Sequence, residues 1–252
     1  MNDTMHELLR QPGIWRAGTG NPRQAAIPSG FTELDQALPG GGWPENALTE
    51  VLHDQYGIGE LRLLMPALAR LSRSGRWIAL IAPPHIPYAP ALAAQGVDLS
   101  HVLLVHPRAS GKGHDALWAL EQALRSGTCA AVLGWPAQAD ERQLRRLQLA
   151  AEAGGTWGIL FRRETTADQS SPAALRLRLR QDEQGTLISL LKCRGGMQRQ
   201  QIRLDLDRPR VRAMPVSPRS CFPQMSLPLE AAETTPGKHG RLRLVRQPEK
   251  LR

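Results

Sequence analysis

The stretch Ala47-Leu-Thr-Glu-Val-Leu-His-Asp-Gln-Tyr-Gly-Ile-Gly-Glu-Leu-Arg62 decides how the rest of the chain is interpreted. Its first six residues predict a strand, its glycines predict a tight turn, and the leucine spacing over residues 61–72 predicts a helix. Phosphate-binding loops have this order, because the backbone N–H groups at the start of the helix attract phosphate. The side chains of the turn therefore decide whether the chain binds a nucleotide.

This turn lacks the side chains that a phosphate-binding loop needs. Gly57 and Gly59 provide backbone freedom, and Gly59 stands where the second glycine of the motif belongs. The next position requires lysine and holds Glu60; the one after requires Ser or Thr for Mg²⁺ and holds Leu61. Two like charges about 4 Å apart in a partly dry site repel each other by several kcal/mol. We therefore expect no tight ATP binding and no bound cofactor.

On either side of this turn, strands alternate with helices. Strands are predicted by apolar runs at residues 77–82, 102–105, 129–133 and 156–161. Helices are predicted at residues 88–94, 115–126 and 141–153. Strands that alternate with helices form βαβ units, so the sequence predicts an α/β fold with a mainly parallel sheet.

The pattern changes after residue 174. Leu175-Arg-Leu-Arg-Leu-Arg180 alternates strictly, which predicts a half-exposed strand with its arginines outward. Further strands are predicted at residues 186–192 and 201–206, which together give an antiparallel meander at the edge of the sheet. The arginine row is interpreted as a solvated face, with a row of phosphate contacts as the alternative.

Composition divides the chain into three parts: an N-terminal arm (residues 1–26), a core (27–206) and a tail (207–252). The tail holds seven prolines and ten Lys or Arg against four Asp or Glu, so it carries +6 of the net charge of +9. It has no hydrophobic periodicity, and we expect it to be flexible and disordered.

Cysteine usage and hydropathy indicate the cellular compartment of the protein. The three cysteines are far apart and form no CxxC pair, which fits a reducing cytoplasm and argues against a zinc site. No apolar run approaches the roughly 20 residues that a membrane span needs. The first residues do not show the basic segment followed by an apolar segment that is typical of a signal peptide. We expect a cytoplasmic protein with no bound metal and no membrane partner.

The order of segments resembles the RecA core. The run Ile27-Pro-Ser-Gly-Phe-Thr-Glu-Leu-Asp35 resembles its entry motif, and Gly96-Val-Asp-Leu-Ser-His-Val-Leu-Leu104 is similar to a further RecA segment. The resemblance covers residues 27–206. It implies a RecA-like three-layer α/β core with a mainly parallel sheet and antiparallel edge strands.

The chain departs from RecA where catalysis takes place. Pro84 occupies the position of the catalytic glutamate, and Gly134-Trp-Pro136 stands where the metal-binding (Walker B) aspartate should end a strand. Together with Glu60, these departures remove three requirements of phosphoryl transfer. We therefore expect a non-catalytic protein without catalytic residues.

Within RecA-like proteins, the chain resembles the ImuA family. Ile14-Trp15-Arg16, Gly40-Gly-Gly-Trp-Pro44 and Lys192-Cys-Arg-Gly-Gly196 are similar to segments of ImuA chains. The resemblance implies an accessory role in SOS-induced, error-prone translesion DNA synthesis, with ImuB and RecA as partners and DNA contacted directly or through them. The alternative is an SOS cell-division inhibitor of the SulA type, which is also RecA-like without a working phosphate loop and blocks assembly of a tubulin-like GTPase.

Several positions are candidates for contacts with partners. Gln224-Met-Ser-Leu227-Pro-Leu229 resembles the peptide that polymerases insert into the sliding clamp, with chance similarity as the alternative. Trp15 and Arg16 are candidates for protein contacts in the arm. The helix face that carries Arg142, Arg145 and Arg146 is interpreted as solvated, with contact with DNA as the alternative. The basic end of the tail, with Arg241, Arg243 and Arg246, is a candidate for holding DNA or an acidic partner.

Overall fold

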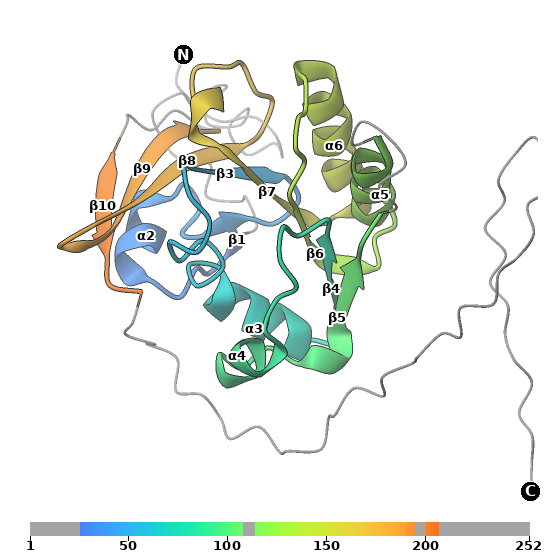
Figure 1. Cartoon of the computed structure of the whole chain (residues 1–252), viewed down its shortest axis with the longest axis horizontal. Coiled ribbons are helices and arrows are strands. Elements are labelled where there is room, and N and C mark those ends of the chain that lie inside the picture. The colour runs from blue at the N-terminus through green and yellow to red at the C-terminus, as the bar shows by residue number, and fades with distance from the viewer. Residues whose placement is uncertain (1–25, 108–113, 195–199, 207–252) are drawn as a thin grey trace, which may run out of the picture. The chain divides into compact units, whose positions relative to one another are not determined.

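The computed structural model describes residues 26–107, 114–194 and 200–206. Over these residues the chain is a mixed α/β protein built on an eight-stranded sheet of order β10-β9-β8-β3-β7-β6-β4-β5 (Figure 1). The strands are β1 (Ala26–Ile27), β2 (Trp43–Pro44), β3 (Leu48–His53), β4 (Trp77–Ile81), β5 (Val102–Val105), β6 (Cys129–Gly134), β7 (Trp157–Arg163), β8 (Leu175–Asp182), β9 (Gly185–Cys193) and β10 (Gln201–Leu204). The helices are α2 (Thr32–Ala37), α3 (Met65–Arg73), α4 (Ala89–Ala94), α5 (His114–Arg125) and α6 (Glu141–Gly154), with 3₁₀ turns η1 (Leu99–His101) and η2 (Glu164–Thr166).

Strand directions confirm the predicted sheet. Strands β8, β3, β7, β6, β4 and β5 run parallel, whereas β9 is antiparallel to β8 and β10 is antiparallel to β9. The carboxyl ends of the six parallel strands therefore lie on the same side of the molecule. The meander that follows residue 174 lies at the opposite side of the sheet from β5, as the change of pattern predicts.

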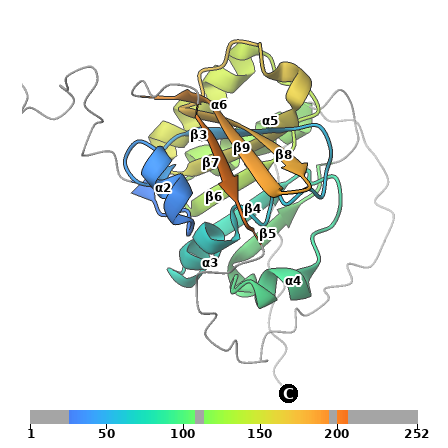
Figure 2. The ribbon, with the colours of Figure 1, turned by 90° about the vertical axis from the view of Figure 1, so that its left-hand side faces the viewer.

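Helices cover both faces of the sheet (Figures 1 and 2). Helices α5 and α6 pack on one face, where Leu120 and Leu147 meet Val132 and Leu160. Helices α2 and α3 pack on the other face around a stack of Trp43 on Trp157, whose ring centroids are 5.5 Å apart. Burial of apolar surface in these two clusters is what holds the three layers together.

Helix ends follow from local sequence. Helix α6 begins with a capping box in which Asp140 accepts from the N–H of Gln143, and it ends at Gly155 with φ 59°. The structure thus confirms the predicted helix at residues 141–153 to within one residue. Helix α3 carries Pro66 in its first turn, as expected, but begins four residues later than predicted, because residues 61–64 form turns in which Leu63 and Leu64 are buried in the core.

The predicted core boundaries, 27 and 206, nearly coincide with the limits of the described residues. The tail and, apart from Ala26, the arm lie outside those residues, so the three-part division stays a prediction. No helix among the described residues is long and apolar enough to cross a membrane. The same residues contain no group of three or more His, Cys, Asp or Glu side chains that could hold a metal ion.

Candidate functional site

The turn after β3 is closed by its own carboxylate. The N–H of Gly57 donates to both Oε1 and Oε2 of Glu60 at 3.0 Å, and the Glu60 side chain is buried. In a phosphate-binding loop this backbone group would face a phosphate oxygen. The anion that the turn attracts therefore comes from the chain itself, and Glu60, named from sequence as a wrong charge, fills part of the cradle.

A second contact covers the same turn. Gly59 has φ 99°, and a Cβ built on it would lie 2.8 Å from Cδ1 of Leu206, just beyond β10. Between this turn, the β8–β9 connection and the end of β10 lies a cavity of about 510 Å³. Its charged lining residues are Glu60, Arg62 and Asp205, so acids outnumber bases. Such a lining disfavours the several negative charges of a nucleoside triphosphate.

The other two catalytic positions hold apolar groups. Ala82, which follows β4, has φ 53°, and the next residues are Pro83 and an exposed Pro84. Trp135, which follows β6, is buried and stacks on Phe161 with ring centroids 4.6 Å apart. An indole packed on a phenyl ring occupies the place where the sequence comparison put the metal-binding aspartate.

Aromatic rings continue from this point to the surface. The ring of His53 lies 6.2 Å from that of Phe161 and 5.0 Å from that of Tyr56, which lies 6.3 Å from the ring of His85. The loop beyond His85 exposes 76% of Ile86 and 73% of Tyr88.

We call Tyr56, His85, Ile86 and Tyr88 the aromatic end. It lies where the parallel strands β3 and β4 end, and prolines at 83, 84 and 87 restrict its loop. Exposed apolar side chains on a stiff loop suit contact with a protein better than contact with phosphate. This surface could not be predicted from the sequence, because apolar loop residues give no periodic signal.

A buried ion cluster lies beside the site, and it overturns one sequence expectation. Arg176 was expected to point outward, yet it is buried and its Nε donates to Glu50 Oε2 at 2.6 Å. Arg162 and Ser171 each donate to Oε1 of Glu50 at 3.0 Å. The segment of residues 164–174 folds over this part of β8, which explains why an alternating strand is covered on both faces.

The rest of the arginine row is also engaged within the chain. Arg178 Nε lies 3.1 Å from Glu164 Oε1 without donating to it in line, and Arg180 donates to the same carboxylate. The arginines of β8 thus have carboxylate or carbonyl partners, so the alternative of a phosphate-binding row is wrong for Arg176 and disfavoured for the other two.

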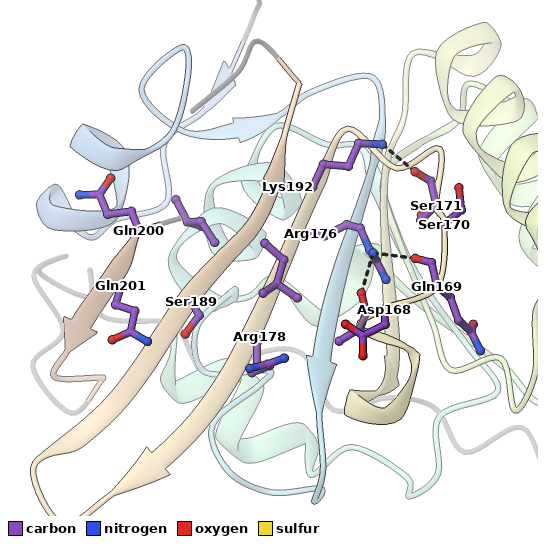
Figure 3. Close-up of a pocket in the computed structure, with 13 residues that line it drawn as sticks. Asp168, Gln169, Ser170, Ser171, Arg176, Arg178, Ser189, Lys192, Gln200 and Gln201 are labelled. Carbon is purple, nitrogen blue, oxygen red and sulfur yellow. Dashed lines mark hydrogen bonds between the residues drawn. The ribbon is translucent and has the colours of Figure 1, made fainter. Parts of the chain in front are cut away.

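A polar cavity of about 840 Å³ lies over β8 and β9 (Figure 3). Arg176 and Lys192 point from these strands towards residues 168–171, and Lys192 Nζ donates to the carbonyl of Ser171 at 2.6 Å. Burial, with the nearby positive charge of Arg176, lowers the pKa of Lys192. Both cations thus donate to carbonyls of the loop that lines the cavity.

The arginines of α6 form the exposed face that their spacing predicts. Arg142, Arg145 and Arg146 are all exposed, and Arg146 bridges to Glu121 of α5, which also bonds Arg125. Contact with DNA at this face stays a prediction. The remaining candidates lie outside the described residues: Trp15, Arg16, Gln224, Leu227, Leu229, Arg241, Arg243 and Arg246.

One family model matches the part of the chain that contains this site. Residues 47–158 match the family model described as "Cell division inhibitor SulA". The chain is 41% identical over 101 residues to the cell division inhibitor SulA of Edwardsiella piscicida, covering 39% of this chain and 57% of that protein. It is 28% identical over 132 residues to SulA of Yersinia enterocolitica, covering 52% of this chain and 77% of the other.

Two further comparisons concern RecA and a solved structure. The chain is 33% identical over 130 residues to the protein RecA of a Picosynechococcus species, covering 50% of this chain and 36% of RecA. The crystal structure of SulA from Pseudomonas aeruginosa matches with a TM-score of 0.38 and 28% identity, covering 46% of this chain and 97% of that one. The chain thus spans only part of the length of several curated relatives.

These findings correct the expected function. An accessory role of the ImuA type in translesion synthesis is contradicted, because the matching family model and most of the curated relatives above are SulA proteins. They support the alternative that the sequence left open. The segment that carries the closed turn, the aromatic end and the stacked Trp135 is therefore similar to SulA cell-division inhibitors.

Proposed function

We propose that this protein is an SOS cell-division inhibitor of the SulA type that acts by binding another protein. The observation that carries the proposal is the match of residues 47–158 to the SulA family model. That segment runs from the strand before the closed turn to the start of β7, so it includes the three positions at which an ATPase would hold its catalytic groups.

The geometry of the turn supports a role without catalysis. The carboxylate of Glu60 accepts the hydrogen bond of the Gly57 N–H, and Trp135 stands at the position of the metal-binding acid. Transfer of a phosphoryl group needs a cation at the first position and a carboxylate–metal pair at the second. We propose that the protein neither binds nor hydrolyses ATP, and titration calorimetry with ATP and Mg²⁺ should detect no binding in the micromolar range.

A RecA-like core is the finer statement of the fold that we propose. It is supported by a sheet in which a glycine turn follows the central strand β3, and by the 33% identity to RecA over 130 residues. On this proposal the protein keeps the scaffold of an ATPase. The end of the sheet at which an ATPase binds its nucleotide then serves another purpose.

The partner that the SulA-type resemblance implies is a tubulin-like division GTPase. We propose that it docks on the aromatic end, where Ile86 and Tyr88 stand exposed beside Tyr56. Burial of a large apolar side chain contributes about 1.5–3 kcal/mol. Removing both Ile86 and Tyr88 should therefore raise the dissociation constant more than about tenfold.

Expression of the full chain in a rod-shaped bacterium tests the function directly. Wild type should produce long undivided cells, and the double variant Ile86→Ser/Tyr88→Ser should divide normally at equal protein level. The matched control is Leu149→Ser, which removes an exposed leucine on α6 and should still cause filaments. Normal division with soluble wild-type protein, together with no binding to the purified division GTPase, would reject the proposal.

A further inference from the structure

A bulge in β9 changes the face of the sheet onto which Lys192 points. Lys192 pairs with Arg176 of β8, whereas Leu190 pairs with the next residue of β8, Leu177. Leu191 is therefore an additional residue in β9. Without it, alternation along the strand would turn Lys192 to the face on which Leu190 is buried in the core. Bulges re-aim side chains in this way and are frequent beside functional sites.

The face that Lys192 reaches carries the polar cavity over β8 and β9 (Figure 3). Leu48, which packs under helices α5 and α6, shares its face of β3 with Glu50, and Glu50 lies opposite Arg176 of β8. The cavity of about 840 Å³ thus lies on the helix-covered face, beside the loop of residues 167–171. None of its described lining residues belongs to the aromatic end. It is a second concave surface that shares no residue with the proposed docking site.

Lys192 brings to this cavity a positive charge that no carboxylate among the described residues pairs with. Its Nζ donates to the carbonyl of Ser171, which is neutral. Of the charged groups that influence its pKa, Arg176 and Arg194 repel the ammonium group and Glu50 attracts it. That carboxylate is already bonded to two guanidinium groups. An anion in the cavity would therefore meet an ammonium group that still has donor hydrogens to offer.

Neutral hydrogen-bonding groups line much of the remaining wall. Within the described ranges, the side chains of Ser189, Gln200 and Gln201 form no hydrogen bond. Hydroxyl and amide groups of this kind both donate and accept, as the groups of a peptide backbone do. Leu191, the additional residue of the bulge, adds an apolar contact. The lining therefore combines one cation with several groups that are complementary to peptide bonds.

The same lining does not suit a nucleic acid. Its arginines, Arg176 and Arg178, already form ion pairs within the chain. No aromatic ring on which a base could stack is present among the lining residues that the structure describes. Asp168 lies well away from Lys192 in Figure 3 and would repel a second negative charge. A single negative charge on an otherwise neutral chain therefore fits better than a row of phosphates.

We propose that this cavity binds a short extended segment of a partner protein, in which one acidic side chain pairs with Lys192. Crossing the sheet from β8 to β10 covers two inter-strand spacings, about 10 Å. About three extended residues span that length. The peptide groups next to the acidic residue bond to Ser189 and Gln201. This contact goes beyond the proposed function and does not depend on it.

Selection from random hexapeptides displayed on phage tests the site without knowledge of the partner. Peptides selected on the full wild-type chain should be enriched in sequences with one Asp or Glu, and this enrichment should vanish on Lys192→Gln with an unchanged circular dichroism spectrum. Lys192→Arg, which keeps the charge, should retain the enrichment, as should the control Arg145→Gln on α6. No acidic preference on wild type, or the same preference on Lys192→Gln, would overturn the proposal.

Nuclear magnetic resonance of the full chain locates the contact. A selected hexapeptide should shift the backbone amide signals of Ser189 and Gln201. Replacing its acidic residue with the matching amide should weaken binding about tenfold or more, because a hydrogen bond between charged groups is lost. Ile86→Ser/Tyr88→Ser should bind the hexapeptide as wild type does, which separates this site from the proposed division block. Shifts confined to the aromatic end, or equal binding of the neutral hexapeptide, would refute the site.

Discussion

Replacing Glu50 with glutamine removes the carboxylate that two buried guanidinium groups share. Glu50 is fully buried, and Arg162 and Arg176 approach its two oxygens at 3.0 and 2.6 Å. Glutamine keeps the shape of the side chain but has one acceptor oxygen and no charge. The variant therefore leaves two buried cations without a neutralising partner.

The magnitude follows from this burial. Breaking a buried ion pair by removing one member costs about 3–5 kcal/mol, because an uncompensated charge remains in a poorly hydrated site. A domain of this size loses about 2–4 °C of Tm for each kcal/mol, so Glu50→Gln should melt about 10 °C below wild type. Arg176 also holds the loop at residues 166–169 through three carbonyls, so the loss should spread to that loop.

Thermal and urea unfolding, followed by circular dichroism, would measure this effect. The matched control is Glu164→Gln, which removes a partner of Arg178 and Arg180 nearer the surface and should cost less than about 1 kcal/mol. If Glu50→Gln and Glu164→Gln lowered stability equally, or if Glu50→Gln lost less than about 1 kcal/mol, the network would not hold the loop as argued.

Three further predictions concern single positions. Gly59→Ala should destabilise the fold by about 1–3 kcal/mol, because alanine is strained at φ 99° and its Cβ would press on Leu206; an unchanged urea midpoint would contradict the contact. Asp140→Ala removes the side-chain acceptor of the Gln143 N–H and should lower the free energy of unfolding by about 1 kcal/mol. Asp140→Asn keeps an acceptor oxygen and should retain most of that stability in the same urea measurement. Burial raises the pKa of Cys193 to about 11, so its alkylation by iodoacetamide, read by mass spectrometry, should keep rising with pH beyond 9; a plateau below pH 9 would show a more exposed thiol.

Most of the sheet could be predicted from sequence, since its signal is local. The run Cys129–Leu133 is apolar throughout, and it forms β6, buried along its whole length. The meander was predicted by the change from continuous to alternating patterns at Leu175. Helix α6 was predicted to within one residue, and the structure shows that a capping box and a left-handed glycine mark its ends. In each case a few neighbouring residues decide the structure.

The predictions that failed concern contacts between residues that lie far apart in the sequence. Arg176 follows an alternating pattern that predicts exposure, but its partner Glu50 lies 126 positions away and a loop covers both. The missing lysine of the turn was evident from Glu60, whereas the bonds from Gly57 to its carboxylate were not. The ImuA interpretation relied partly on short motifs such as Ile14-Trp15-Arg16, which lie outside residues 47–158, the segment that matches SulA.

The carboxylate of Glu60 bears on how such a protein is regulated. On the proposed function, the turn after β3 is held by an internal carboxylate, so a nucleotide would not switch it between an empty and a loaded form. An inhibitor of that kind would not end its own action by hydrolysing a nucleotide. On the proposed function, the strength and duration of a division block are set by the number of molecules in the cell, and therefore by the rates of synthesis and proteolysis.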